Sequence, residues 1–314
     1  MPPATAKKPA SQELVVREEP NINLVVPDYI RADDGKNFGF EVLDNSDFAV
    51  PRLKIMQGLS PEKEQYSFLK NGAIFHSGQE IELPQPLLAV VVYVDKRYIL
   101  WRPRDAGGGI LARADDAKHW FPANESFTVR LDKKDGGATV TWTTKPTVLE
   151  SGLADWGTQN PADSDSPPAA TLMYNYLLAF PDNPKMLPAV LTLQRTAVKA
   201  AQRLNLKFRA MQRPTFQSVV RFRTFLDHAG ANDFYSVNTE LAGNIWDCKK
   251  WCETDVEPRQ LDPNGKLYQD YRASYLQVAK EGLQIKDEEG LQGDAADALN
   301  VDGIDALTED KVGF

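Results

Sequence analysis

Residues 86–104 read PLLAVVVYVDKRYILWRPR and include the longest apolar run of the chain, residues 87–94. A run of this length is too short for a membrane span, which needs ~20 apolar residues, and it is typical of a central strand buried on both faces. The residues after it alternate between two sides of a strand, with Tyr98, Leu100 and Arg102 opposite Arg97, Ile99 and Trp101. The stretch therefore predicts strand structure along most of its length.

Short strands separated by turn residues are expected along much of the remaining chain, at residues 52–57, on either side of Ser77–Gly78, and at 127–131, 138–144, 173–180, 189–193, 216–226 and 234–237. The period changes after Gln194, where Val198, Ala201, Leu204 and Phe208 fall on one face of a helix. Two further helices are predicted at residues 240–253 and 267–283, separated by a linker that contains proline and glycine.

These elements predict a mainly β fold with α elements (α+β), in which about ten short strands form a small β-barrel with insertions. A mid-chain helix and C-terminal helices would complete it. We expect a partly disordered leader at residues 1–45, a central domain at 46–240, a helical C-terminal extension at 241–285 and an acidic disordered tail at 286–314. The leader has no apolar core of a signal peptide.

The charge is distributed unevenly along the chain. The whole chain has a formal net charge of −8, yet residues 185–223 carry nine basic residues and neither Asp nor Glu. Residues 286–314 carry nine acidic and two basic residues and end in Phe314. This layout is typical of a protein that binds a polyanion and carries a polyanion mimic of its own.

Signals of catalysis are weak. Cys248 and Cys252 are the only cysteines, and their spacing without a second pair does not suit zinc but favours a reduced, cytosolic compartment. His76, His119 and His228 lie in segments that need no catalytic explanation. We expect a protein that is not an enzyme and has no metal or cofactor. A nuclease built from scattered carboxylates is the alternative that a single sequence does not exclude.

Cations interleaved with aromatics are better represented, and they suit unpaired nucleic acid, because cations track phosphates and flat rings stack on bases. The candidate phosphate-binding residues are Lys96, Arg97, Arg102, Arg104, Lys199, Arg203, Lys207 and Arg209, and the candidate base-stacking residues are Tyr98, Trp101 and Trp120. The alternative is structural: the aromatics belong to the core with arginines at its margin, and the helix within 195–213 has a solvated basic face.

Three segments resemble phage-encoded single-stranded DNA-binding proteins built on an oligonucleotide/oligosaccharide-binding (OB) barrel. They are PRLKIMQGLSPE, the W-x-P-R-x-x-G-G-G pattern that begins at Trp101, and LTLQRTAVKAAQRLN, all within residues 50–240. The resemblance implies an OB-like nucleic-acid-binding domain at residues 46–240.

The end of the chain, NVDGIDALTEDKVGF, resembles the acidic tails of bacterial and phage single-stranded DNA-binding proteins. In that class the terminal Phe docks in pockets of partner proteins, and the acidic run competes with DNA for the basic groove. The resemblance implies that Glu309, Asp310 and Phe314 bind replication or recombination proteins.

The sequence thus predicts a protein that binds and protects single-stranded DNA without sequence preference, in phage-like replication or recombination. We expect the protein in the cytoplasm, which is the host cytoplasm if a phage encodes it, and we expect no membrane partner. The sequence also allows a homo-oligomer. The alternatives are a strand-annealing recombinase and a virion or structural accessory protein.

Overall fold

The computed structural model describes residues 50–103, 108–131, 138–229, 232–249, 258–259 and 261–283. The chain divides into two units, Met1–Asp47 and Phe48–Phe314, and every described residue belongs to the second. Among the described helices, none is long and apolar enough to cross a membrane.

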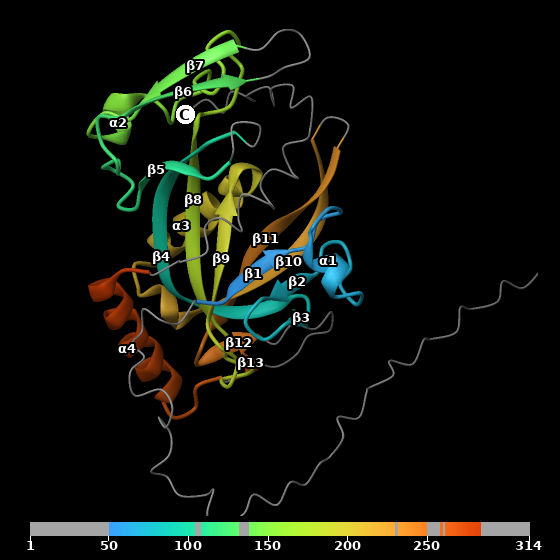
Figure 1. Ribbon diagram of the computed structural model, residues 1–314. Helices are drawn as coiled ribbons and strands as arrows, with labels where there is room; N and C mark the ends of the chain where they lie inside the picture. Colours follow the sequence, from blue (N-terminus) through green and yellow to red (C-terminus); the bar gives the residue numbers. More distant parts are fainter. Residues whose placement is uncertain are drawn as a thin grey trace, which may run out of the picture. The chain divides into compact units, whose positions relative to one another are not determined.

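One large sheet dominates the described part (Figure 1). Its strands in chain order are β1 (Arg52–Ile55), β2 (Ile74–His76), β3 (Ile81–Leu83), β4 (Leu87–Trp101), β5 (Ile110–Ala114), β8 (Ala170–Ala179), β9 (Ala189–Gln194), β10 (Ser218–Ala229), β11 (Asn232–Asn244), β12 (Asp247–Lys249) and β13 (Pro258–Arg259). Their order across the sheet is β13-β12-β11-β10-β4-β8-β9-β1-β2-β3, and β5 also pairs with β4. All these pairs are antiparallel except β1 with β9, which is parallel.

Strand β4 is buried on both faces, as its apolar run predicts. Ala89 and Val91 join the apolar cluster on one face, whereas Val90 and Val92 join the cluster on the other. The register against β8 shifts between Val91 and Tyr93, which marks a β-bulge. Because one residue is inserted there, the faces to which the later residues of β4 point are exchanged relative to the earlier ones.

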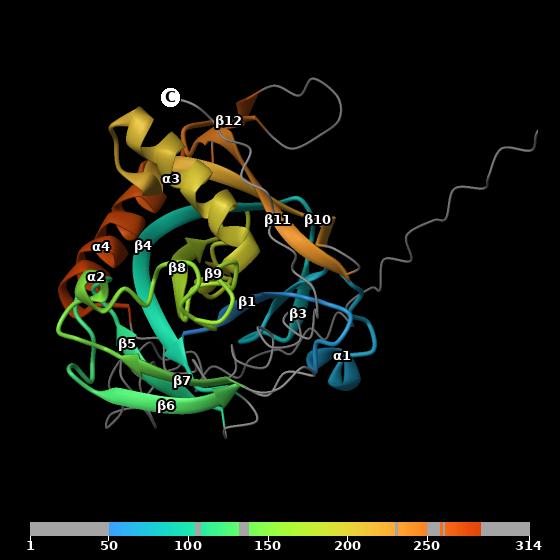
Figure 2. The same ribbon diagram turned by 90° about the horizontal axis from the view of Figure 1, so that it is seen from above.

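The sheet curls, and helix α3 (Val198–Met211) lies across its concave side (Figure 2). The apolar residues at helical spacing, Ala201, Leu204 and Phe208, are buried against the sheet as predicted. Burying a side chain such as Leu or Phe contributes about 1.5–3 kcal/mol, so this face holds the helix in place.

The curl also brings β11 against the end of β1. The side-chain amide of Gln57 pairs with Tyr235 as a strand would: its Nε2 donates to the Tyr235 carbonyl at 2.9 Å, and its Oε1 accepts from the Tyr235 N–H at 2.8 Å. Gly72, whose φ is +80°, lies directly against the Tyr235 ring, where a Cβ would collide. The sheet is therefore connected across its opening by side-chain rather than strand pairing.

Helix α4 (Lys266–Glu281) packs on the other face of β4, and its existence was predicted. Asp262 begins it by accepting the N–H groups of Leu267 at 3.0 Å and Tyr268 at 2.9 Å, which have no partner within the helix. Ring contacts then attach it to the body, at 6.1 Å between Tyr93 and Tyr275 and 5.5 Å between Phe216 and Tyr268.

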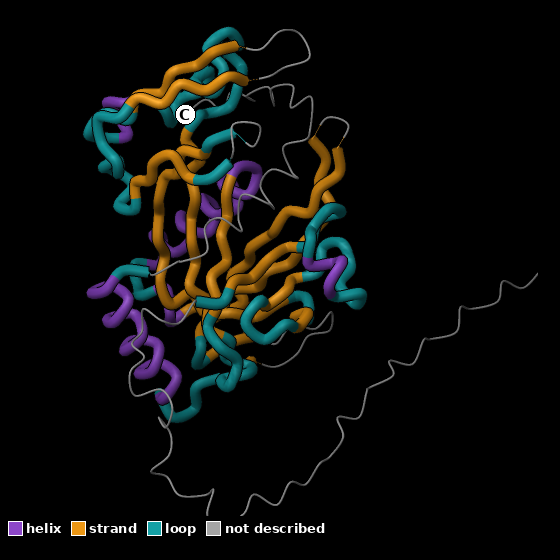
Figure 3. The backbone as a smooth tube through the Cα atoms, viewed as in Figure 1, coloured by secondary structure: helices purple, strands orange, loops and turns teal. Residues whose placement is uncertain are grey.

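The residues between β5 and β8 form a smaller unit with its own core. The hairpin β6 (Ser126–Leu131) and β7 (Ala138–Thr143) was predicted, and the short helix α2 (Val148–Ser151) follows it. A further short helix, α1 (Glu62–Gln65), lies between β1 and β2. Figure 3 shows that strands outweigh helices throughout, which confirms a mainly β fold with α elements.

The prediction of a helix at residues 240–253 is wrong. Residues up to Asn244 continue β11, where Glu240 pairs with Arg221 and Leu241 with Val220, and residues 247–249 form β12. The hydrogen bonds and side-chain packing of β11 on β10 override the helix propensity of these residues, because intrinsic propensities are weak. Within the described residues, the predicted C-terminal extension therefore contains one long helix, α4, and not two.

Candidate nucleic-acid interface

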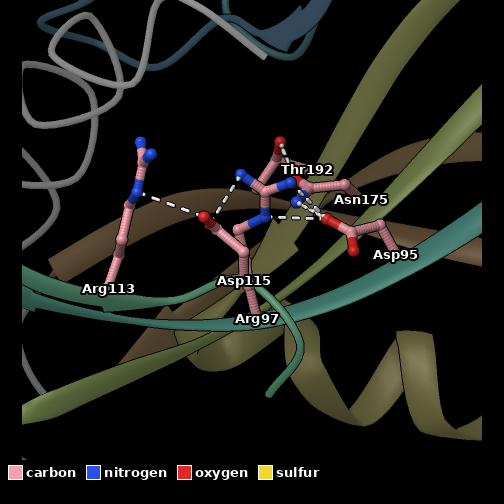
Figure 4. Close-up of polar contacts among 6 residues, drawn as sticks. All are labelled: Asp95, Arg97, Arg113, Asp115, Asn175 and Thr192. Carbon is pink, nitrogen blue, oxygen red and sulfur yellow. Dashed lines mark hydrogen bonds and ion pairs between the residues drawn. The ribbon is translucent and has the colours of Figure 1, made fainter. Parts of the chain in front are cut away.

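Arg97, a predicted phosphate ligand, is the centre of a buried polar cluster (Figure 4). Its Nε donates to Asp95 Oδ2 at 2.7 Å, and its NH1 lies 3.5 Å from Asp115 Oδ1. Asn175 Nδ2 also donates to Asp95 Oδ2, at 3.2 Å, and Thr192 Oγ1 donates to Asn175 Oδ1 at 2.7 Å. The cluster joins β4, β8 and β9 to the turn after β5.

The cluster changes the interpretation of Arg97. Only 6% of the residue is exposed, and its guanidinium faces two carboxylates. A cation buried in this way is committed to its partners, since removing them would leave it uncompensated. Arg97 is therefore a structural residue that joins β4 to the turn after β5, and not an exposed phosphate ligand.

Trp120 is also placed differently from its predicted role. It is 3% exposed, lies in the core of the smaller unit with Trp142, and donates from Nε1 to Ser151 Oγ at 3.0 Å. A ring enclosed on both faces has no surface on which a base could stack. Its neighbour Phe121 is 72% exposed instead.

Tyr98 and Trp101 are half-buried, since Tyr98 packs against the core that contains Trp120, and Trp101 packs against Ile99 and Met173. Lys96 is exposed, and its Nζ lies 5.5 Å from the centre of the Tyr98 ring, which is a cation–π distance. Burial raises the pKa of the Tyr98 hydroxyl. This Lys96–Tyr98 pair is accessible at its cation.

Lys96 lies on the face of the sheet that α3 covers. It is paired in register with Tyr174 of β8, and Tyr174 points to the same face as Tyr176, two residues on. The Tyr176 hydroxyl lies 3.2 Å from the Ala201 carbonyl and 2.9 Å from Asn205 Oδ1, both in α3. Segments about a hundred residues apart in the chain thus contribute cations to one face.

The outer face of α3 carries Lys199, Arg203 and Arg209, all exposed, with Leu206 between them at 68% exposure. These residues follow helical spacing and therefore lie along one stripe. No acidic residue occurs in α3 or elsewhere in residues 185–223. From Lys199 to Arg209 the stripe is about 15 Å long, at 1.5 Å per residue.

Lys207 is placed apart from this stripe. Its Nζ donates to the Thr239 carbonyl of β11 at 3.0 Å, and the residue is half-buried. Among the described residues, β12 pairs with β11 only at Gly243 and Asn244, so Thr239 has no partner in β12, and the lysine supplies a donor to its carbonyl. We assign Lys207 to the packing of α3 on the sheet.

A second cation–aromatic pair follows the C-terminal end of α3. The guanidinium carbon of Arg213 lies 5.9 Å from the centre of the Trp246 ring, and Trp246 is 42% exposed. The sequence interpretation missed Trp246 because it placed the residue in a helix. The turn between β11 and β12 presents it to solvent.

Five cations lie on the outer face of α3, just after its C-terminal end, or in the Lys96–Tyr98 pair on the face of the sheet that α3 covers. They are Lys96, Lys199, Arg203, Arg209 and Arg213. We call this set the α3 face. Asp and Glu are absent from α3, whereas Lys96 lines a groove together with Asp95, Asp115 and Asp116. The neighbouring Glu240 lies 3.4 Å from Arg221.

Arg102 is exposed and ends β4, where its N–H donates to the Gly109 carbonyl at 2.8 Å. Arg104 and the predicted tail residues Glu309, Asp310 and Phe314 lie outside the described residues. The part of the chain that the structure describes contains no group of three or more His, Cys, Asp or Glu side chains that would hold a metal ion.

Comparison with known proteins places the chain among phage proteins. The family described as Pam3 phage gp34-like protein matches residues 18–284, which is most of the chain. No curated protein and no solved structure matches it.

Proposed function

Because the chain belongs to the Pam3 phage gp34-like protein family, we propose that it is a phage protein that binds single-stranded DNA without sequence preference and catalyses no reaction. It would act in phage replication or recombination, in the cytoplasm of the infected cell. The curled sheet would serve as an OB-like platform, with the helix on its concave side. The resemblance of residues 50–240 to phage single-stranded DNA-binding proteins supports this proposal together with the α3 face.

The observation that carries the proposal is the exposed basic stripe of α3, a helix without acidic residues, together with the two cation–aromatic pairs. The three exposed cations of α3 have no acidic residue beside them in the helix, so this stripe attracts an anionic backbone. The half-buried Tyr98 and the exposed Trp246 offer ring surface in the two pairs. Such a surface is tolerant of sequence, since every base has a flat face.

Salt dependence tests this proposal directly. If the five cations of the α3 face each neutralise one phosphate, the logarithm of the affinity for dT oligomers falls by about 3.5 per decade of salt, at ~0.7 per contact. Replacing Lys199, Arg203 and Arg209 by Gln reduces the slope to about 1.4. Tryptophan fluorescence during titration at several salt concentrations measures both values.

The matched control replaces Lys70, Lys266 and Lys280, three exposed lysines away from the α3 face, by Gln. It removes the same net charge and leaves the slope unchanged. An equal reduction in both triple variants would reduce the proposal to a general effect of net charge.

The acidic segment at residues 286–314 gives a second test. Its deletion removes a net charge of −7 and tightens DNA binding at low salt if the segment competes for the same cations. Titration of the full chain and of residues 1–285 with the same oligomer measures this. Equal affinities would leave the segment only the role of binding partner proteins.

Leu206 supports a second function. A leucine exposed at 68% in the middle of a basic stripe suits an acidic protein surface with an apolar centre better than it suits DNA. The protein would then be a virion or structural accessory protein. An absence of tryptophan quenching by dT oligomers at low salt favours this function and overturns the first.

A further inference from the structure

Strand β4 has a gap along one of its two edges. On that edge β10 pairs with it from Leu87 to Val90, and β5 pairs with it from Tyr98 to Trp101. Between these two pairings, residues 92–97 have no strand partner on this edge among the described residues. On the opposite edge, β8 pairs with β4 from Val90 to Leu100. We call this gap the β4 slot, and at ~3.3 Å per residue it is about 20 Å long.

The β4 slot opens onto a groove in the molecular surface. The groove is lined by residues 93–96 of β4 and by residues 115–118, the turn that follows β5. Helix α4 contacts β4 through the Tyr93 and Tyr275 rings but does not line the groove. Space is therefore present beside the unpaired edge.

The backbone along the slot has unused hydrogen-bonding groups. Alternate residues of a strand direct their N–H and C=O groups to one edge, and no backbone hydrogen bond is found from residues 92–96 to anything but β8 in the described part. An unpaired edge in a rigid sheet is a template for an added strand. The slot thus has the backbone chemistry that recognises an extended peptide.

The flanking strands restrict what can enter. Because β5 and β10 both occupy the same edge of β4, a second sheet would collide with them before reaching residues 92–97. A second copy of this chain that presents its own β4 slot meets the same obstacle. The occupant is therefore a single extended segment without neighbouring strands.

Charge indicates the chemistry of that segment. Lys96 and Lys118, at the rim, are exposed and have no carboxylate partner among the described residues. The carboxylates of the groove are engaged: Asp95 with Arg97, Asp115 with Arg97 and Arg113, and Asp116 with His119. The lining has two lysines and three aspartates, but all three aspartates have a cation or His119 as partner. The two lysines are therefore the charges available to a ligand, which favours an acidic strand.

We propose that the β4 slot binds an extended acidic segment of a partner protein by strand addition, with acidic side chains directed to Lys96 and Lys118. Main-chain hydrogen bonds to β4 supply the affinity, and the two lysines supply the preference for acidic sequences. The proposal does not depend on DNA binding, because it rests on the edge of β4 and the groove beside it.

Hydrogen exchange on the full chain tests it with a synthetic probe. The probe is the peptide TEVETEVETE with blocked ends, and its controls are TKVKTKVKTK and a TEVETEVETE peptide with alternate N-methylated amides, which cannot pair as a strand. We expect the acidic probe alone to slow exchange of the amides within residues 92–97 that point away from β8. Protection elsewhere, or no binding, overturns the proposal.

Two further measurements decide which segment occupies the slot and whether Lys118 contacts the acidic probe. If the amides that point away from β8 are already protected in the free full chain, a segment of the chain itself fills the slot and the partner proposal fails. Lys118→Glu should weaken probe binding by about threefold to tenfold, the effect of one exposed ion pair and its reversal. Lys145→Glu, at an exposed lysine that does not line the groove, is the control, and an equal loss in both contradicts the proposed contact.

Discussion

The Arg97 cluster and the α3 face contain the same residue types in opposite environments. In the cluster, one arginine lies between Asp95 and Asp115 below the surface. On the α3 face, cations stand in solvent with no acid in the helix that carries them. The difference teaches that a cation near aromatics is available to a ligand only where the fold leaves it exposed and without a carboxylate.

We expect substitutions in the Arg97 cluster to lower the unfolding free energy, and substitutions on the α3 face to lower the affinity for DNA. Arg97→Met leaves Asp95, whose side chain is 14% exposed, without its counter-charge, which costs about 3 kcal/mol of unfolding free energy, the lower end of the range for a fully buried pair. Arg203→Met, at an exposed position, changes the unfolding free energy by less than ~0.5 kcal/mol. Urea unfolding of both variants measures this contrast, which is the largest expected here.

DNA titration of the same two variants completes the comparison. Folded Arg97→Met should retain the affinity for dT oligomers, and Arg203→Met should lose part of it. A stable Arg97→Met protein with impaired DNA binding would reverse the two assignments.

The elements that the sequence predicts well are those with a local period. The apolar run at residues 87–94 predicts β4 because both faces of that strand are covered. Ala201, Leu204 and Phe208 predict the inner face of α3 because only that face meets the sheet. In both cases the pattern itself reports burial.

Burial of individual charged residues follows from packing between distant segments. The alternation after Asp95 shows that Arg97 and Tyr98 point to opposite sides, but not which side another segment covers. Asp115, which pairs with Arg97, comes from the turn after β5. Trp246 was missed for a related reason, because the pairing of β10 with β11 decides its environment.

Trp246 gives a way to separate a stacking role from simple exposure. Trp246→Ala removes the ring beside Arg213 and should weaken dT binding by about tenfold to a hundredfold, since one stacked base is worth about 1–3 kcal/mol. Trp156→Ala is the matched control, because that ring is also exposed, at 65%, but lies in the smaller unit away from α3. Equal losses in the two variants would show that exposed rings contribute without regard to the α3 face.

The smallest expected effect is a change in unfolding free energy at Asp116. Its exposed side chain contacts His119 in the turn beside the Arg97 cluster. Partial burial acts to raise the pKa of Asp116, but hydrogen bonds lower this pKa to about 2. They come from the backbone N–H and the ring of His119 and from the backbone N–H of Lys118. A carboxyl whose pKa is lowered by folding stabilises the fold above its unfolded value of about 3.9, and this contribution is lost as the pH falls towards 2. Asp116→Asn should therefore be less stable than the wild type at pH 6, by less than ~1 kcal/mol because the side chain is half exposed, and the difference should vanish near pH 2. Urea unfolding at a series of pH values measures this, and a difference that persists at pH 2 would mean that the amide disturbs the turn itself.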